Sequence, residues 1–251
     1  TRMSQAFAGS SYIQQIVLAE VDEFVQRHRS TPALPVALEL RARFNPGLEP
    51  AWFGSLMELI NIITMLSVIL TGAALIRERE HGTVEHLLVM PVTPTEIMLS
   101  KIWSMGLVVL CAAAFSIHVI VRGTLQVPIE GSLPLFFTGA ALHLFATTSM
   151  GIFLATLARS MPQFGLLMML VLLPLEMLSG GMTPRESMPD AVRYLMTLAP
   201  TTHFTELGQA ILYRAAGIDV VWPSFLALLL IGGTLFALSL TRFRTAIGQM
   251  A

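Results

Sequence analysis

Four histidine or glutamate side chains and one asparagine lie inside otherwise apolar stretches of the sequence, and they are the residues best placed to do chemistry. They are Glu58, Asn61, His118, His143 and Glu176. A carboxylate or imidazole in hydrocarbon is costly unless it has a partner, so each is a candidate to contact a substrate, an ion or a proton. Glu58 and Asn61 lie three residues apart on the same side of a helix. Two interpretations are open: they line a substrate path, or their side chains extend to water at the membrane interface.

The spacing of these residues does not favour metal or nucleotide chemistry. No two histidines lie three or four residues apart, the spacing that zinc enzymes use on one helix. The phosphate-binding pattern G-x-x-x-x-G-K-[ST] is absent, and the single Cys111 cannot form a disulfide within the chain. We therefore expect no metal and no cofactor in this chain. An intramembrane enzyme that uses His118, His143 and Glu176 stays open as an alternative.

His143 belongs to a stripe of mostly small residues at intervals of four. The other members of this stripe are Gly139, Thr147, Gly151 and Ala155. Small side chains let helices in a membrane approach closely, so the stripe predicts a helix-packing face. A contact between His143 and a substrate or proton is the alternative.

The composition indicates a membrane protein. Of the 251 residues, 54% are hydrophobic and 12% are charged, and the mean hydropathy is +0.70. Ordinary soluble domains carry about 25% charged residues. The net charge of −1 argues against a nucleic-acid partner.

Five apolar stretches approach the roughly 20 residues that a helix needs to cross a bilayer. They lie near 55–76, 102–121, 133–157, 164–179 and 223–240. The fourth is the weakest, because it is short and contains Pro174 and Glu176. The segments 77–101 and 158–163 and the tail after 240 hold more Lys and Arg than the opposite loops, six against four. This bias places them in the cytoplasm.

Residues 1–54 differ from the rest of the chain. Apolar residues at helical spacing predict a helix over 12–28, and the alternating stretch 36–44 predicts a half-buried strand. We interpret 1–54 as the C-terminal part of an extracytoplasmic α+β domain and 55–251 as the transmembrane domain. The expected fold is thus an all-α polytopic membrane bundle with a partial α+β domain at its N-terminus.

The segment 77–100 carries an unusual density of charge between two apolar stretches. Its first part predicts an amphipathic helix that Pro91 ends. In its second part, Thr93, Pro94 and Glu96 have the spacing of a capping box with proline at the first helical position. Such an element lies along the membrane surface, either as a solvated loop or as a docking site for a soluble partner.

The string from Arg77 to Lys101 resembles the signature of ABC-2 type exporter permeases, E-R-E-x-G-T-x-E-x-L-L-x-x-P-[VI]. The matching residues are Glu78, Arg79, Glu80, Gly82, Thr83, Glu85, Leu87, Leu88, Pro91 and Val92. The stretches 43–53 and 178–212 also resemble segments of the drug-export branch of this family. The resemblance implies that 77–100 is the coupling helix, and that Glu78, Arg79, Glu80, Gly82, Thr83, Glu85, Leu87, Leu88 and Pro91 contact the ATPase.

The same resemblance implies an assembly in the bacterial inner membrane. Two permease halves pair, and two cytoplasmic ABC ATPase subunits, which hold ATP and magnesium, dock beneath them. A periplasmic adaptor is a further partner. The family has six spans in each half, so the first helix and most of the outer domain are expected to lie outside this chain. Glu58 and Asn61 depart from the family, which is more apolar at those positions.

The resemblance implies that the segment 180–215 is a re-entrant helix pair that gates the exit on the outer face; a plain pair of surface helices is the alternative. Gly180, Gly181 and Pro184 are the gate candidates, and Glu58, Asn61, His143 and Glu176 are the candidates for the translocation path. Thr183 to Glu186 repeats the cap–proline–glutamate pattern, which predicts helices over 183–198 and 202–215. The implied function is ATP-driven efflux of an amphiphilic or drug-like compound. The alternatives are a lipid or glycan exporter, an ion-coupled carrier, and an anchor or sensor that docks an ATPase without transport.

Overall fold

The computed structural model describes residues 16–17, 19–21, 23–24, 50–81 and 92–248. The described residues between 16 and 24 are helical, in agreement with the predicted helix. The predicted strand lies outside the described residues. Within the described part of the chain there is no strand, so the all-α fold class is confirmed and the α+β character of 1–54 gains no support.

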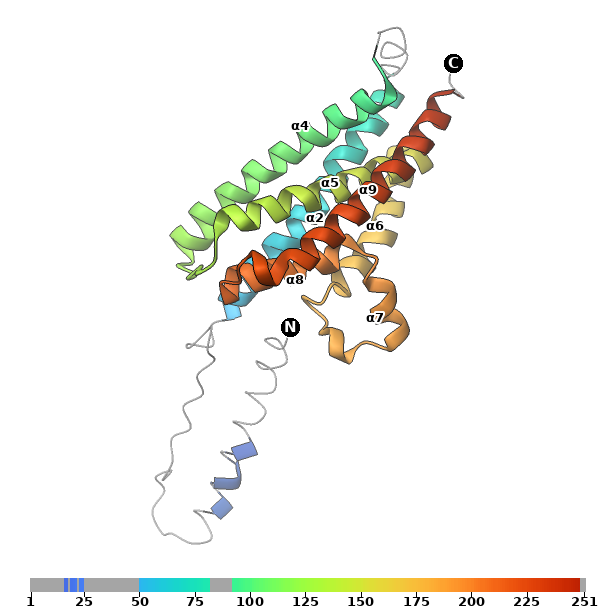
Figure 1. Cartoon of the computed structure of the whole chain (residues 1–251). Coiled ribbons are helices and arrows are strands. Elements are labelled where there is room, and N and C mark those ends of the chain that lie inside the picture. The colour runs from blue at the N-terminus through green and yellow to red at the C-terminus, as the bar shows by residue number, and fades with distance from the viewer. Residues whose placement is uncertain (1–15, 18, 22, 25–49, 82–91, 249–251) are drawn as a thin grey trace.

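Four long helices build the bundle (Figure 1). They are α2 (Pro50–Glu80), α4 (Pro94–Phe115) with its continuation η1 (Ser116–Thr124), α5 (Leu133–Leu157) and α9 (Ile218–Gly248). Each is long and apolar enough to cross a membrane, and the four helices coincide with four of the predicted spans. The remaining predicted span, 164–179, corresponds to α6 (Met161–Met177), which has 17 residues. At 1.5 Å per residue α6 is about 26 Å long, slightly shorter than the hydrocarbon core of about 30 Å.

Helix α5 lies inside the bundle, with α4 on one side and α9 on the other (Figure 1). A side chain added at Gly151 would place its Cβ 2.8 Å from the carbonyl oxygen of Val68 in α2. One added at Gly139 would place its Cβ 2.7 Å from the Leu207 side chain, in the segment after α7. These close approaches need residues without a side chain, so the interpretation of the stripe as a packing face is confirmed.

Short helices fill the segment between α6 and α9. They are η2 (Arg185–Ser187), α7 (Asp190–Met196) and α8 (Pro200–Arg214). The single helix predicted over 183–198 is wrong, because a 3₁₀ turn and a seven-residue α-helix form instead, without a capping bond at the start of η2. Pro189 explains the break, since the residue before a proline avoids the helical region and Met188 is extended. The helix predicted over 202–215 is confirmed as α8.

Helix η1 continues α4 in a wider π-helical winding for nine residues. Val121 of η1 and Ile211 of α8 belong to one buried apolar cluster. The backbone at Gly131, in the loop after η1, also lies directly against Ile211. Helix α8 and the C-terminal part of the α4–η1 helix therefore lie at one end of the bundle. The C-terminus of α2 and the start of α6 lie at the opposite end.

Candidate functional site

Consecutive charged residues at the end of α2 each contact a different helix. The Lys101 ammonium of α4 donates to both carboxylate oxygens of Glu78. The guanidinium of Arg79 donates to the carbonyl oxygens of Ala155 and Ala158, at 2.7 and 2.9 Å. Ala155 lies in the last turn of α5 and Ala158 is its C-cap residue, at the end of the helix where the dipole favours a positive charge.

Glu80 makes the third of these contacts. Its carboxylate accepts a hydrogen bond from the backbone N–H of Met161, at 3.2 Å, at the first residue of α6. A carboxylate is stabilised at a helix N-terminus because the first N–H groups have no partner within the helix. The end of α2 is thus joined to α4, α5 and α6 by three consecutive residues, which we call the α2 anchor (Glu78, Arg79 and Glu80).

The start of α4 lies at the same end of the bundle. The predicted capping box is confirmed: Thr93 N–H donates to Glu96 Oε2 at 2.7 Å, and Glu96 N–H donates to Thr93 Oγ1 at 3.3 Å. Arg244 of α9 donates to Thr95 Oγ1 at 3.4 Å. The segments predicted to share one side of the membrane therefore lie together.

The other predicted coupling residues cannot be placed in the same way. They are Gly82, Thr83, Glu85, Leu87, Leu88 and Pro91, and they lie outside the described residues. Sequence reasoning assigned Glu78, Arg79 and Glu80 to contacts with the ATPase. In the structure these three side chains contact helices of their own chain.

His143 lies in the interior of the bundle. Its Nε2 and the hydroxyl of Thr64 are 2.8 Å apart, and its ring stacks on Phe204 with 4.1 Å between the ring centroids. One turn further along, Ser67 donates to Thr147 at 2.6 Å. These bonds form a polar seam between α2 and α5. His143 is fully buried within this seam, on the packing face of α5, and a contact between His143 and a substrate stays a prediction.

Glu58 lies in a groove of about 290 Å³ between α2 and the helix formed by α4 and η1. Apart from Glu58, Ser55 and Ser116, the residues that line this groove are apolar. Asn61 is only partly exposed on the same helix, and His118 is exposed on η1, where its Nδ1 lies 2.8 Å from the Ala114 carbonyl oxygen. The groove thus offers one exposed carboxylate beside a large apolar surface.

The remaining candidates lie where α6 ends. Glu176 is half-buried and within electrostatic range of Glu58. Gly180 has a φ of 96°, a backbone conformation that favours glycine, and it turns the chain back toward the bundle. Gly181 is buried against Met57 of α2, and Pro184 is partly exposed. The predicted gate residues therefore form a tight turn packed on α2.

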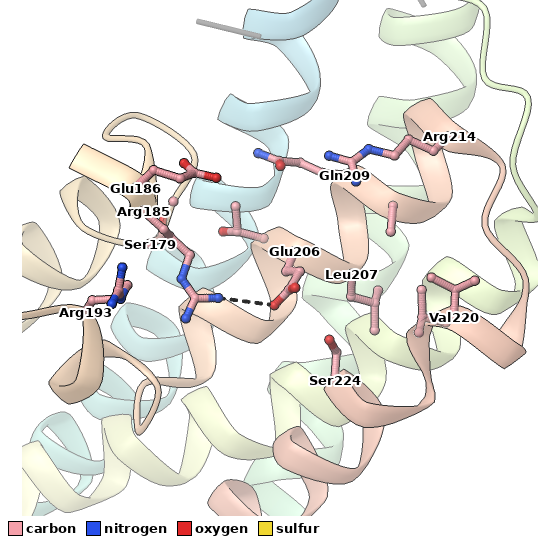
Figure 2. Close-up of a pocket in the computed structure, with 14 residues that line it drawn as sticks. Ser179, Arg185, Glu186, Arg193, Glu206, Leu207, Gln209, Arg214, Val220 and Ser224 are labelled. Carbon is pink, nitrogen blue, oxygen red and sulfur yellow. Dashed lines mark hydrogen bonds and ion pairs between the residues drawn. The ribbon is translucent and has the colours of Figure 1, made fainter. Parts of the chain in front are cut away.

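Beside this turn the structure has a charged cleft that sequence reasoning missed. It has a volume of about 350 Å³ and lies between the segment 179–193, α8 and the start of α9 (Figure 2). Its charged lining residues are Arg185, Glu186, Arg193, Glu206 and Arg214. The gathering of three arginines in the polar segment between two apolar stretches was the signal that could have indicated it. Among the described residues, no cluster of three or more His, Cys, Asp or Glu side chains could hold a metal ion.

Comparison with known proteins agrees with this architecture. Residues 4–213 match the family model described as "ABC-2 type transporter". The chain belongs to this family, and it is a membrane transport permease rather than an enzyme.

Named relatives show the same class. The chain is 64% identical, over all 251 residues, to the "Inner membrane transport permease YhhJ" of Escherichia coli K12, and spans 67% of that protein's length. It is 30% identical to the "Probable multidrug ABC transporter permease YbhR" of the same organism, over 97% of this chain and 66% of the relative. The described part of the chain has four membrane-capable helices, and together with these relatives they show an integral inner-membrane protein.

Proposed function

We propose that this chain is part of the permease half of an ATP-driven exporter, and that it couples ATP hydrolysis by a separate ATPase to efflux of an amphiphilic compound. The observation that carries the proposal is the α2 anchor. Three consecutive residues join the end of α2 to α4, α5 and α6. A force applied next to this point reaches α4, α5 and α6 as well as α2.

The position of the segment 82–91 explains how the force would enter. This segment directly follows α2 and precedes α4, and these two helices share the ion pair between Glu78 and Lys101. An ATPase that contacts 82–91 therefore displaces α2 and α4 as one unit. Arg79 and Glu80 pass the displacement to α5 and α6. Each nucleotide state of the ATPase can shift the bundle only by binding one conformation better than the other.

The partners follow from this mechanism. ATP and magnesium are bound by cytoplasmic ATPase subunits, and a second permease half completes the path across the lipid bilayer. A periplasmic adaptor and an extracytoplasmic domain that includes residues 1–54 complete the proposed assembly. The remaining motif residues, from Gly82 to Pro91, form the ATPase contact, and the turn at Gly180 and Gly181 lies at the exit.

The groove at Glu58 supports an amphiphilic substrate. A carboxylate beside apolar walls suits a compound with a cationic group and a hydrophobic body. The relatives named as multidrug permeases agree with a drug-like substrate. Asn61 extends the polar part of this face, while Glu176 adds a second carboxylate near the end of α6.

The experiment compares Arg79→Gln with Arg242→Gln in the full-length protein, reconstituted with its ATPase in proteoliposomes. Arg242 is an exposed arginine of α9 at the same end of the bundle and serves as the matched control. We measure ATP hydrolysis, ATPase retention and ATP-dependent efflux of a fluorescent amphiphilic cation. Arg79→Gln should retain the ATPase but lower efflux at least about tenfold, because two charge-assisted hydrogen bonds of about 1.5–3 kcal/mol each are lost. Arg242→Gln should keep both ATPase retention and efflux at the level of the unmodified protein.

Two results would contradict the proposal in different ways. If Arg79→Gln transports as well as Arg242→Gln, coupling does not pass through the α2 anchor. If the unmodified protein retains the ATPase but shows no ATP-dependent efflux of any compound tested, the chain is an anchor or sensor.

A further inference from the structure

The charged cleft beside the turn at Gly180 presents charges of both signs to one cavity (Figure 2). Arg185 approaches from η2, Arg193 from α7, and Glu206 from α8. The bond between Arg185 Nη1 and Glu206 Oε2 is 3.4 Å long. Charge-assisted hydrogen bonds are usually about 2.7–2.9 Å. This pair is therefore loosely joined and can accept a further polar group between or beside its members.

The guanidinium groups of the cleft retain donors for a ligand. Arg193 donates to Asp190 at 2.6 Å, but a guanidinium has five N–H groups, of which this bond uses one. Arg214, on the other side of the cleft, is exposed. Guanidinium groups match the oxygen atoms of phosphate in a bidentate geometry. The cleft therefore suits a phosphate group, and the carboxylates of Glu186 and Glu206 suit a cationic group next to the phosphate.

The side chains around the cleft are of the types found at the depth of lipid headgroups. Tyr194 is 68% exposed on α7, and Trp222 is 56% exposed near the start of α9, so two of the elements that border the cleft carry an exposed aromatic side chain. Tyrosine and tryptophan are enriched at the interface between membrane and water. Leu195 and Leu198, next to Tyr194 in the chain, are also exposed. An apolar and aromatic surface beside charged groups is expected where headgroups meet acyl chains.

We propose that this cleft binds the headgroup of a zwitterionic phospholipid that carries a phosphate and a primary ammonium. Arg185 and Arg193 bind the phosphate, and Glu206 accepts hydrogen bonds from the ammonium. Met177 and Met182, which flank the lining residues Ser179 and Gly180 in the chain, expose 53% and 62% of their surfaces. They provide the apolar surface on which the acyl chains lie.

The charges of the cleft favour this headgroup over two others. A purely anionic headgroup brings no partner for Glu186 and Glu206. A choline headgroup has the same charges, but its quaternary nitrogen has no N–H to donate. The bound lipid joins the segment 179–193 to α8, where the structure otherwise has the long bond between Arg185 and Glu206. This inference does not depend on what the protein transports.

The test is lipid retention by the full-length protein, measured by native mass spectrometry after incubation with one defined phospholipid at a time. The three lipids are phosphatidylethanolamine, phosphatidylcholine and phosphatidylglycerol with identical acyl chains. We expect phosphatidylethanolamine to be retained at least about fivefold more than either of the others. Arg185→Gln should lower its retention about tenfold, as expected for loss of a charge-assisted bond to phosphate. Glu206→Gln should remove the preference over phosphatidylcholine, because the ammonium loses its acceptor.

Arg122→Gln is the matched control, since Arg122 is an exposed arginine of η1 at the same end of the bundle and does not line the cleft. It should retain lipid as the unmodified protein does. Equal retention of the three lipids would overturn the inference, and so would stronger retention of phosphatidylglycerol. Equal retention of phosphatidylethanolamine by Arg185→Gln and Arg122→Gln would also overturn the inference. Thermal unfolding of each variant separates a lost lipid site from a lost fold.

Discussion

The contact between α2 and α5 at Gly151 predicts a large effect for a very small substitution. In Gly151→Ala the new Cβ would lie 2.8 Å from the Val68 carbonyl oxygen and 3.1 Å from the Val68 Cα. Ordinary contacts between such atoms begin near 3.4 Å. Both neighbouring atoms belong to the backbone, so no side-chain rotation can relieve the contact. The two helices must move apart.

The magnitude follows from what this separation disturbs. Overpacking of a well-packed interior costs about 1–3 kcal/mol. The hydrogen bonds from Ser67 to Thr147 and between Thr64 and His143 cross the same seam, at 2.6 and 2.8 Å, and each interhelical bond contributes about 0.6 kcal/mol. Together these terms predict a loss of about 2–4 kcal/mol in the free energy of unfolding.

Gly233→Ala is the matched control, because Gly233 lies in α9 with nothing within 4 Å of the added Cβ. Both substitutions gain the same helix propensity, about 1 kcal/mol, so the difference between them isolates the contact. The assay is reversible unfolding of the full-length protein by SDS in mixed micelles. If Gly151→Ala is as stable as Gly233→Ala, the close packing of α2 on α5 is not what holds the bundle together.

Two further predictions concern contacts of α2. A double-mutant cycle of Glu78→Gln and Lys101→Met should give a coupling energy of about 1–2 kcal/mol. This value lies between those of exposed and buried ion pairs, because Lys101 is mostly buried and Glu78 is partly buried. A coupling energy near zero would mean that the pair does not join α2 to α4. His143→Ala should lower the free energy of unfolding by about 3 kcal/mol or more, since the ring stacked on Phe204 is lost. His143→Phe keeps a ring and loses the bond to Thr64, so it should cost only about 1 kcal/mol, and equal costs for the two variants would contradict the packing role.

The long helices could be predicted from the sequence because their signal is local. An apolar stretch of about 20 residues is recognisable without knowledge of its neighbours, and the predicted span 133–157 has the same bounds as α5. The capping box at Thr93 is equally local, since its two hydrogen bonds join residues three apart. The same pattern failed at Thr183 because Pro189, six residues later, stops the helix before it has formed a full α-helical turn.

The partners of the polar residues could not be predicted, because they depend on helices that are far apart in the sequence. Glu80 meets Met161 and His143 meets Phe204 only once α2, α5, α6 and α8 have packed together. The charged cleft has the same origin, since Arg185 and Glu206 come from separate elements. The sequence indicated which residues are unusual in an apolar chain, and the fold decides which of them become neighbours.

The order of charges in the α2 anchor has a physical explanation in this packing. Successive side chains of an α-helix point about 100° apart, so three consecutive residues at the end of α2 reach in three directions. Acidic Glu78 meets an ammonium, basic Arg79 meets the C-terminal carbonyls of α5, and acidic Glu80 meets the N-terminus of α6. Each sign suits the pole that it faces. Helix α5 ends and α6 begins within a few residues of each other, so Arg79 and Glu80 together attach this short connection to the end of α2. The motif therefore has a structural role of its own, because it fixes the end of α2, next to 82–91 in the chain, to the corner between α5 and α6.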